Sequence, residues 1–169
     1  MIQNVLRLRE IQVSDIMTPR VVMSTVSKEE TVRDVIDRVP IMIYGRMPMI
    51  GETIDEVKGM VLRSEILRKA AVDDYSCDMQ NISREVFHCM QDDSVDKALD
   101  VLLENKVQML IVKDDFGGTV GLITMEDVIE TRLGVEIVDE ADQEGINDGV
   151  HHEDMRELAK QRYEDSESE

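Results

Sequence analysis

GLITMEDVIETRL, residues 121–133, runs from an apolar strand straight into a helix, and its polar residues lie at the junction. Thr124 and Asp127 are three residues apart. If the helix begins near Thr124, the hydroxyl and the carboxylate both lie in its first turn, beside backbone N–H groups that have no partner inside the helix. Such a corner can hold a sugar and a phosphate.

The same spacing is typical of a capping box, in which the hydroxyl and the acid satisfy the amides of the helix itself. Spacing alone favours neither interpretation. A degraded copy of the stretch, GMVLRSEIL, lies about 62 residues earlier, at residues 59–67. A helix cap does not require the neighbouring strand to repeat, so the repeat favours a ligand site and predicts two similar units.

Composition sets the limits of this interpretation. A chain of 169 residues, 42% of them hydrophobic, can form one ordinary domain or two small units that share a core. Its net charge of −18 opposes nonspecific binding to nucleic acid, so we expect no nucleic-acid partner. Two cysteines without metal-ligand spacing predict reduced thiols. No apolar run approaches the roughly 18 residues of a membrane span, which predicts a soluble, intracellular chain.

The first unit is predicted at residues 13–71, after a lead-in at residues 1–12. A turn through Thr18 and Pro19 leads into a β-branched strand at 21–26. A capping box at 27–30 then begins a helix that Pro40 ends. An irregular lead at 44–50 into a short strand, a strand at 57–62 and a helix at 64–71 complete the unit.

A polar linker is predicted at 72–82, and a second unit with the same order at 83–133. It has a strand at 86–90, a helix capped by Asp92, Asp93 or Ser94, and strands at 109–112 and 119–124. Gly134 is the expected C′ residue of the last helix. The sequence therefore predicts an α/β (α+β) fold of two β-α-β-β-α repeats packed about a pseudo-two-fold axis, with a cleft between them.

Residues 134–169 are predicted to form an acidic C-terminal tail. Its cluster of His151, His152, Glu153 and Asp154 can bind a divalent metal, although such a run is more typical of a solvated tail. We assign the two histidines no role.

Each repeat resembles a CBS domain (the cystathionine β-synthase type), and the pair resembles a Bateman module. More narrowly, five segments look like the cytoplasmic module of the CorC/CNNM, or hemolysin-like, family: DIMTPR (15–20), RMP (46–48), DDFGGTVG (114–121), TMEDVIE (124–130) and EIVDEAD (136–142). Members of that family are membrane proteins linked to magnesium and cobalt transport or efflux, and their CBS pair binds adenine nucleotides. The resemblance implies an absent transmembrane domain upstream and a place at the cytoplasmic face of the plasma (inner) membrane.

The resemblance implies one nucleotide site shared by both units. Asp127 would accept the ribose hydroxyls, Thr124 would bind ribose or phosphate, and Tyr44 would lie near the base. Gly45 stands where the family usually has Ser or Thr, which removes one hydroxyl contact. The residues implied by the resemblance are Thr18, Tyr44, Gly45, Arg46, Met47, Pro48, Thr124 and Asp127.

The first unit carries Leu62 and Glu65 at the positions equivalent to Thr124 and Asp127. Leu62 cannot donate a hydrogen bond, and Glu65 reaches one methylene too far. One dominant site per chain is therefore expected.

The expected function is a regulatory adenine-nucleotide-binding module, for ATP or AMP, of a divalent-cation (magnesium/cobalt) transporter or efflux protein. Mg²⁺ is expected to accompany ATP, because the only cations expected near the cleft are Arg20, Arg46 and Arg63. Helical apolar faces at 32–39 and 95–102 predict a homodimer. The alternative is a constitutive dimerisation module without significant nucleotide binding. No triad, phosphate loop or nucleophile motif is present, so no enzymatic activity is expected.

Overall fold

The structure is a computed structural model that describes residues 11–143, with side chains described for residues 11–134. Expectations for residues 1–10 and 144–169, including those for His151 and His152, lie outside the described residues.

Two units with the same order of elements make up the fold. The first contains β2 (Val26–Ser27), α3 (Val32–Arg38), β3 (Arg46–Ile50), β4 (Val57–Leu62) and α4 (Arg63–Ala71). The second contains β5 (Phe87–Met90), α6 (Val95–Asn105), β6 (Met109–Lys113), β7 (Thr119–Thr124) and α7 (Met125–Gln143). The predicted β-α-β-β-α repeat is confirmed.

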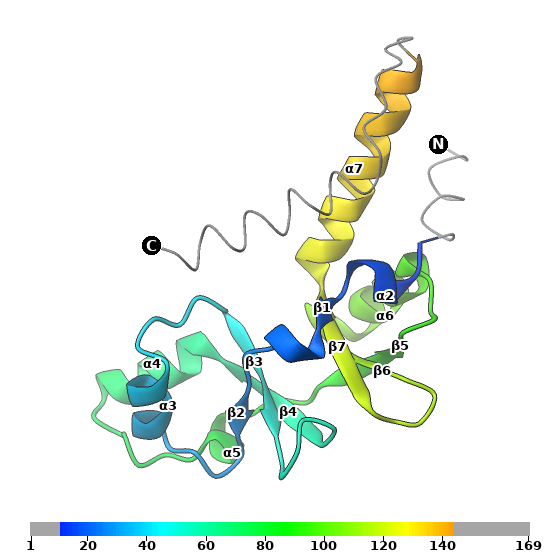
Figure 1. Cartoon of the computed structure of the whole chain (residues 1–169). Coiled ribbons are helices and arrows are strands. Elements are labelled where there is room, and N and C mark those ends of the chain that lie inside the picture. The colour runs from blue at the N-terminus through cyan, green and yellow to red at the C-terminus, as the bar shows by residue number, and fades with distance from the viewer. Residues whose placement is uncertain (1–10, 144–169) are drawn as a thin grey trace.

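The strand pairing also repeats. In each unit the first strand pairs parallel with the second, and the second pairs antiparallel with the third. A register shift lies at Met49/Ile50 in one unit and at Val112/Lys113 in the other. The second sheet gains a fourth strand, β1 (Thr18–Pro19), and has the order β1-β7-β6-β5. Figure 1 shows the two units side by side, with α7 extending away from the second.

Apolar side chains form a core inside each unit and a third cluster between the units. The third cluster contains Met60 of β4 together with Met109, Ile111 and Leu122 of β6 and β7. These sheets therefore meet through apolar side chains, and methionine packs adaptably in such a contact.

Two short helices connect the units. α2 (Val13–Ile16) precedes the first unit but packs on the second, where Val13 is fully buried in the core. α5 (Met79–Ile82) lies inside the predicted linker but packs on the first unit, where Met79 is fully buried. The backbone joins these segments symmetrically, because Val13 N–H of α2 donates to Asp93 O (2.8 Å) and Met79 N–H of α5 donates to Glu30 O (2.9 Å).

The strand predicted at 21–26 is wrong for most of its length. Residues Arg20–Val22 form a 3₁₀ turn, η1, and only Val26 and Ser27 pair with β3. Val21 is 88% exposed. β-branched residues favour a strand only where a neighbouring strand pairs with them, and β3 pairs with this part of the chain only at Val26 and Ser27.

The boundaries of two helices also differ from prediction. Thr31, rather than Ser27, caps α3: its N–H donates to Asp34 Oδ2 (2.9 Å), and its Oγ1 accepts from Asp34 N–H (3.2 Å). Gly134 does not end α7, which continues to Gln143. A glycine inside a helix costs only about 1 kcal/mol relative to alanine, so the helix continues past it.

Candidate functional site

The junction of β7 and α7 forms the predicted corner. Thr124 N–H donates to Asp127 Oδ2 (2.8 Å), and Asp127 N–H donates to Thr124 Oγ1 (3.2 Å). The capping box is therefore formed. It does not exclude a ligand, because a carboxylate offers about four acceptor positions and the cap uses only part of them.

Asp127 is held in an unfavourable setting for a charged group. Burial raises the pKa of its carboxyl, the Thr124 backbone and hydroxyl lower this pKa, and the charges of Glu130 and Glu126 raise it again. The net pKa lies above the ordinary value for aspartate. A partly buried carboxylate at the N-terminus of a helix is a strong hydrogen-bond acceptor for hydroxyl groups. A helix cap alone does not require the carboxylate to be buried.

β1 brings Thr18 to this corner. Thr18 lies opposite Leu122 and Pro19 lies opposite Gly121 on β7. Leu122 and Thr124 point to the same face of their strand, so Thr18 and Thr124 are diagonal neighbours on that face. The close approach needs Gly121, since a Cβ there would meet the carbonyl oxygen of Thr18.

The first unit contributes Arg46. Its Nη2 donates to Gln108 Oε1 (2.7 Å). The bond joins positions that are not equivalent in the repeat, because Arg46 pairs with Leu62 as Met109 pairs with Thr124. Gln108 O accepts from Met125 N–H (2.9 Å) at the start of α7, as Gly45 O accepts from Arg63 N–H (3.0 Å) at the start of α4, so the bond holds Arg46 near the corner. Gln108 was missed in the sequence, where no local pattern indicates it.

Met47 and Pro48 are buried in β3. Pro48 lies opposite Met60, whose N–H and carbonyl both bond to Arg84 instead of β3 (2.9 and 2.8 Å). A proline at this position therefore removes no hydrogen bond between β3 and β4.

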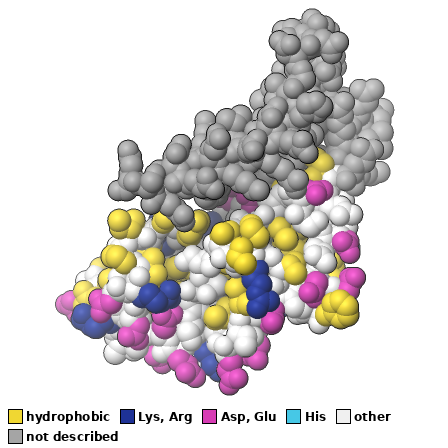
Figure 2. All heavy atoms as spheres, in the orientation of Figure 1, with side chains coloured by type: hydrophobic (Ala, Val, Ile, Leu, Met, Phe, Trp, Pro, Cys, Tyr) yellow, Lys and Arg dark blue, Asp and Glu magenta, His cyan; other side chains and the backbone are white. Residues whose placement is uncertain are grey.

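An open hollow of about 440 Å³, with both polar and apolar lining, lies beside Tyr44. Residues 21–25 form one side, residues 41–44 with Arg38 and Val39 form the other, and Met47 also lines it. Ile41 is 79% exposed there. Figure 2 shows hydrophobic side chains gathered over η1 and the loop before β3. A recess of this size, with apolar side chains and a few polar groups in its lining, can hold a flat ring system.

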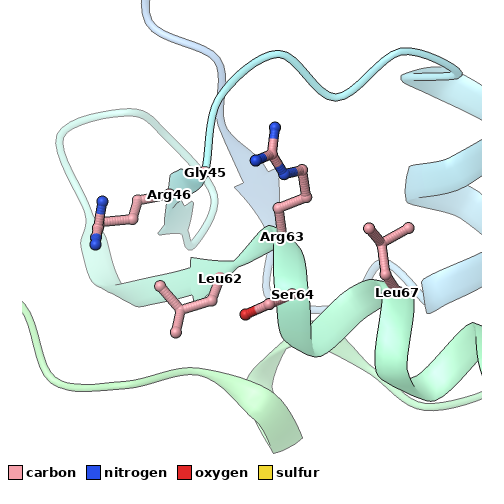
Figure 3. Close-up of a pocket in the computed structure, with 6 residues that line it drawn as sticks. All are labelled: Gly45, Arg46, Leu62, Arg63, Ser64 and Leu67. Atoms are coloured by element: carbon pink, nitrogen blue, oxygen red, sulfur yellow. The ribbon is translucent and has the colours of Figure 1, made fainter.

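The equivalent corner of the first unit is a second open pocket, of about 470 Å³. Figure 3 shows Arg46 and Arg63 pointing away from each other, with Leu62 and Ser64 between them. Glu65, the counterpart of Asp127, pairs with Arg68 (3.3 Å) and Arg84 (3.4 Å). Its carboxylate is neutralised by protein, which disfavours a ribose at this corner.

Two of the three expected cations are used by the fold. Arg20 Nη1 donates to Asp55 Oδ1 (2.7 Å), and Arg63 Nη1 donates to Met42 O (2.8 Å). The third expected cation, Arg46, donates to the side-chain amide oxygen of Gln108, which carries no charge. The expectation that Arg20 and Arg63 offer charge to a ligand is not supported.

The described part of the chain contains no cluster of three or more His, Cys, Asp or Glu residues suited to a metal ion. No helix in that part has the length and apolar character needed to cross a membrane.

Known proteins share this architecture. The family model described as CBS domain matches residues 77–134. The magnesium and cobalt efflux protein CorC of Escherichia coli (strain K12) is 31% identical over 144 residues, which cover 85% of this chain and 49% of that protein. CorC of Vibrio cholerae is 30% identical over 163 residues, covering 96% of this chain and 54% of that protein. This chain thus spans about half the length of these curated relatives.

A solved structure is similar over most of the described residues. The CBS domain of the bacterial CNNM/CorC family Mg²⁺ transporter in complex with ATP has a TM-score of 0.73 and 34% identity, and the match covers 79% of this chain and 94% of that one. The paired units and their shared corner therefore define a tandem CBS module. The chain belongs to the CorC/CNNM family.

Proposed function

We propose that this chain is a regulatory module that binds an adenine nucleotide at the corner between its units and thereby controls a divalent-cation transporter or efflux protein. One observation carries the proposal: Arg46 of the first unit is held by Gln108 beside the Thr124–Asp127 corner of the second. A ligand at this point contacts both units, so its binding changes how they are held together. The ATP complex of the similar CBS domain supports this proposal.

The roles follow from the chemistry of each position. Asp127 accepts the ribose hydroxyls, Thr124 and Thr18 bind ribose or phosphate oxygens, and Arg46 turns from Gln108 to a phosphate. The base enters the hollow beside Tyr44. Gly45 is exposed, and nothing lies within 4 Å of its absent Cβ, so the hydroxyl that Ser or Thr would supply is replaced by solvent.

Mg²⁺ accompanies ATP in this proposal. With a net charge of −18 and one suitably placed arginine, the module offsets little of a triphosphate's charge. A divalent ion bound to the phosphates neutralises the remainder, and the N-terminus of α7 adds about half a positive charge. AMP carries less charge and needs no ion.

We also propose that the module acts without catalysis, as a homodimer at the cytoplasmic face of the plasma (inner) membrane, attached to a transmembrane domain. The apolar helix faces at 32–39 and 95–102, from which the sequence predicted a dimer, are not free to form one. Their residues Val32, Val35, Val95 and Leu102 are fully buried within their own units. Among the side chains that the structure describes, the exposed large apolar residues on α-helices are instead Leu67 of α4, Leu103 of α6, and Ile129 and Leu133 of α7. The four-residue spacing in α7 puts its two residues on one face, which a second copy can cover.

Calorimetric titration of the purified chain with ATP, ADP and AMP, each with and without Mg²⁺, tests the proposal. We expect saturable binding of at least one of these nucleotides. Failure of all of them to bind would favour the alternative, a constitutive dimerisation module, which the partial degradation of the repeat at Leu62 and Glu65 keeps open.

A further inference from the structure

Four residues join the units at the end of β7 opposite Thr124. We name Arg20, Asp55, Lys113 and Thr119 the Asp55 cluster. Asp55 Oδ1 accepts from Arg20 Nη1 (2.7 Å) and from Thr119 N–H (2.9 Å). Lys113 Nζ donates to Asp55 O (2.9 Å) and to Thr119 Oγ1 (3.0 Å), and Arg20 Nη1 also donates to Thr119 O (3.2 Å).

The bonds of the Asp55 cluster connect three distant parts of the chain. Asp55 lies in the turn between β3 and β4 of the first unit, Thr119 begins β7 of the second, and Arg20 begins η1. Thr119 is fully buried, so its backbone N–H has exchanged water for the Asp55 carboxylate. An exposed ion pair such as that of Arg20 with Asp55 contributes little to the free energy of folding by itself. The buried N–H of Thr119, however, is costly to leave without a hydrogen-bond acceptor, so the Asp55 carboxylate must stay in place.

The Asp55 cluster also determines where one side of the hollow beside Tyr44 lies. Val21 and Val22 follow Arg20 directly and line the hollow. η1 has three residues, and its one recorded internal bond runs from Met23 N–H to Arg20 O (3.3 Å). Such a short turn does not hold its own position. It is anchored by β1 on β7 before it and by the Arg20 side chain on Asp55 and Thr119.

We propose that Arg20 and Asp55 are positioning residues for the base end of the nucleotide site. They hold η1 so that Val21 and Val22 face the loop before β3, and they do not touch the ligand themselves. This inference rests on the proposed function. It assigns Arg20 a different role from that expected of a cation near the phosphates, because its guanidinium is already committed to Asp55 and Thr119.

The test compares adenosine, which has no phosphate, with ATP and Mg²⁺ by titration calorimetry on the folded chain. Arg20→Met removes the guanidinium and keeps much of the side-chain length. We expect it to weaken both ligands by the same factor, about fivefold or more, because the base end is disturbed. Arg20→Lys keeps a charge that can reach Asp55 and should recover most of the affinity. Lys97→Met, which removes an ion pair of 2.7 Å with Asp93 remote from the interface between units, is the matched control and should change neither.

Unchanged affinity for adenosine in Arg20→Met would overturn the positioning role while leaving the proposed function intact. A loss confined to ATP would also overturn it, since Arg20 would then act on the phosphates. If Arg20→Met does not fold, Asp55→Asn decides instead: its amide oxygen still accepts from Thr119 N–H, but it lacks the charge that holds Arg20. An unmodified chain that binds neither ligand would overturn both the inference and the proposed function.

Discussion

At the scale of a single residue, burial and hydrogen bonding act in opposite directions on the charge of Asp127. Burial raises the pKa of its carboxyl, so its charge is costly in the folded chain, and the cap formed with Thr124 compensates only in part. A neutral residue would be easier to bury at this position. The cost is understandable if the ionised form is needed to accept hydrogen bonds from a ligand.

We predict that Asp127→Ala weakens adenine-nucleotide affinity at least about tenfold while circular dichroism shows an intact fold. Removing a charged acceptor of hydrogen bonds costs about 1.5–3 kcal/mol. Glu65→Ala is the matched control, because Glu65 occupies the equivalent position and already pairs with Arg68 and Arg84. A comparable loss in the control would assign the nucleotide to the first unit's corner.

The raised pKa of Asp127 predicts a pH dependence of binding. As the pH falls through this raised pKa, the carboxyl takes up a proton and loses acceptor capacity, so affinity for adenosine should decline at a higher pH than an ordinary aspartate would cause. Adenosine is the suitable probe because it has no titrating phosphate. The same decline of affinity in Asp127→Ala would assign the effect to another group.

The effect of Asp127 on the free energy of unfolding has the opposite sign. Because the pKa of its carboxyl is higher in the folded state, the ionised group favours unfolding at pH values above the folded pKa. This destabilising contribution disappears as the pH falls through the folded pKa.

At the scale of elements, local patterns identified the strands and helices that have partners close in sequence. Residues 57–62 and 119–124 were predicted as strands with the bounds that β4 and β7 have, because each is a mainly apolar run that leads directly into a helix. The predicted helix at 64–71 agrees with α4 to within one residue.

The missed elements depend on contacts that a local pattern does not contain. Whether residues 21–26 form a strand is decided by how far β3 extends, and α2 packs on a unit that the chain reaches only after about seventy further residues. The same holds for the site. The Thr124–Asp127 spacing was visible in the sequence, whereas the bond of Arg46 to Gln108 and the commitment of Arg20 to Asp55 follow only from the packing of the units.

The pairing of β1 with β7 depends on Gly121. We predict that Gly121→Ala lowers the free energy of unfolding by about 1–3 kcal/mol, because its Cβ would meet Thr18 O and Met17 Sδ and must displace β1. Thr18 moves with β1, so nucleotide affinity should fall as well. Urea unfolding measures the first effect. Gly45→Ala, where nothing lies within 4 Å of the new Cβ, should leave stability nearly unchanged. Equal effects of the two substitutions would contradict the proposed close approach.

At the scale of the whole molecule, two weakly related halves share one polar corner and one apolar interface. Repetition explains why the two corners have the same backbone, since Gly45 O accepts from Arg63 N–H (3.0 Å) as Gln108 O accepts from Met125 N–H (2.9 Å). Divergence explains why the two corners differ, since Thr124 and Asp127 have become Leu62 and Glu65 in the other half. Met60 and Met109 lie in the apolar cluster between the halves, where methionine packs adaptably.

The overall charge predicts a metal dependence. We expect ATP to bind more tightly in Mg²⁺ than in EDTA at fixed ionic strength, and AMP to be nearly indifferent, because only the triphosphate leaves uncompensated charge beside Arg46. Calorimetry with both nucleotides under both conditions measures this difference. Equal ATP affinities would remove the metal from the mechanism and leave simple nucleotide sensing.

The stoichiometry and residue dependence of ATP binding test the central claim, that one nucleotide site is shared by both units. In a single calorimetric experiment, the unmodified chain and the double variant Arg46→Ala/Asp127→Ala are titrated with ATP and Mg²⁺; each substitution lies in a different unit. The account predicts one nucleotide per chain for the unmodified protein and no detectable binding for the variant. Two nucleotides per chain, or undiminished binding by the folded variant, would contradict it.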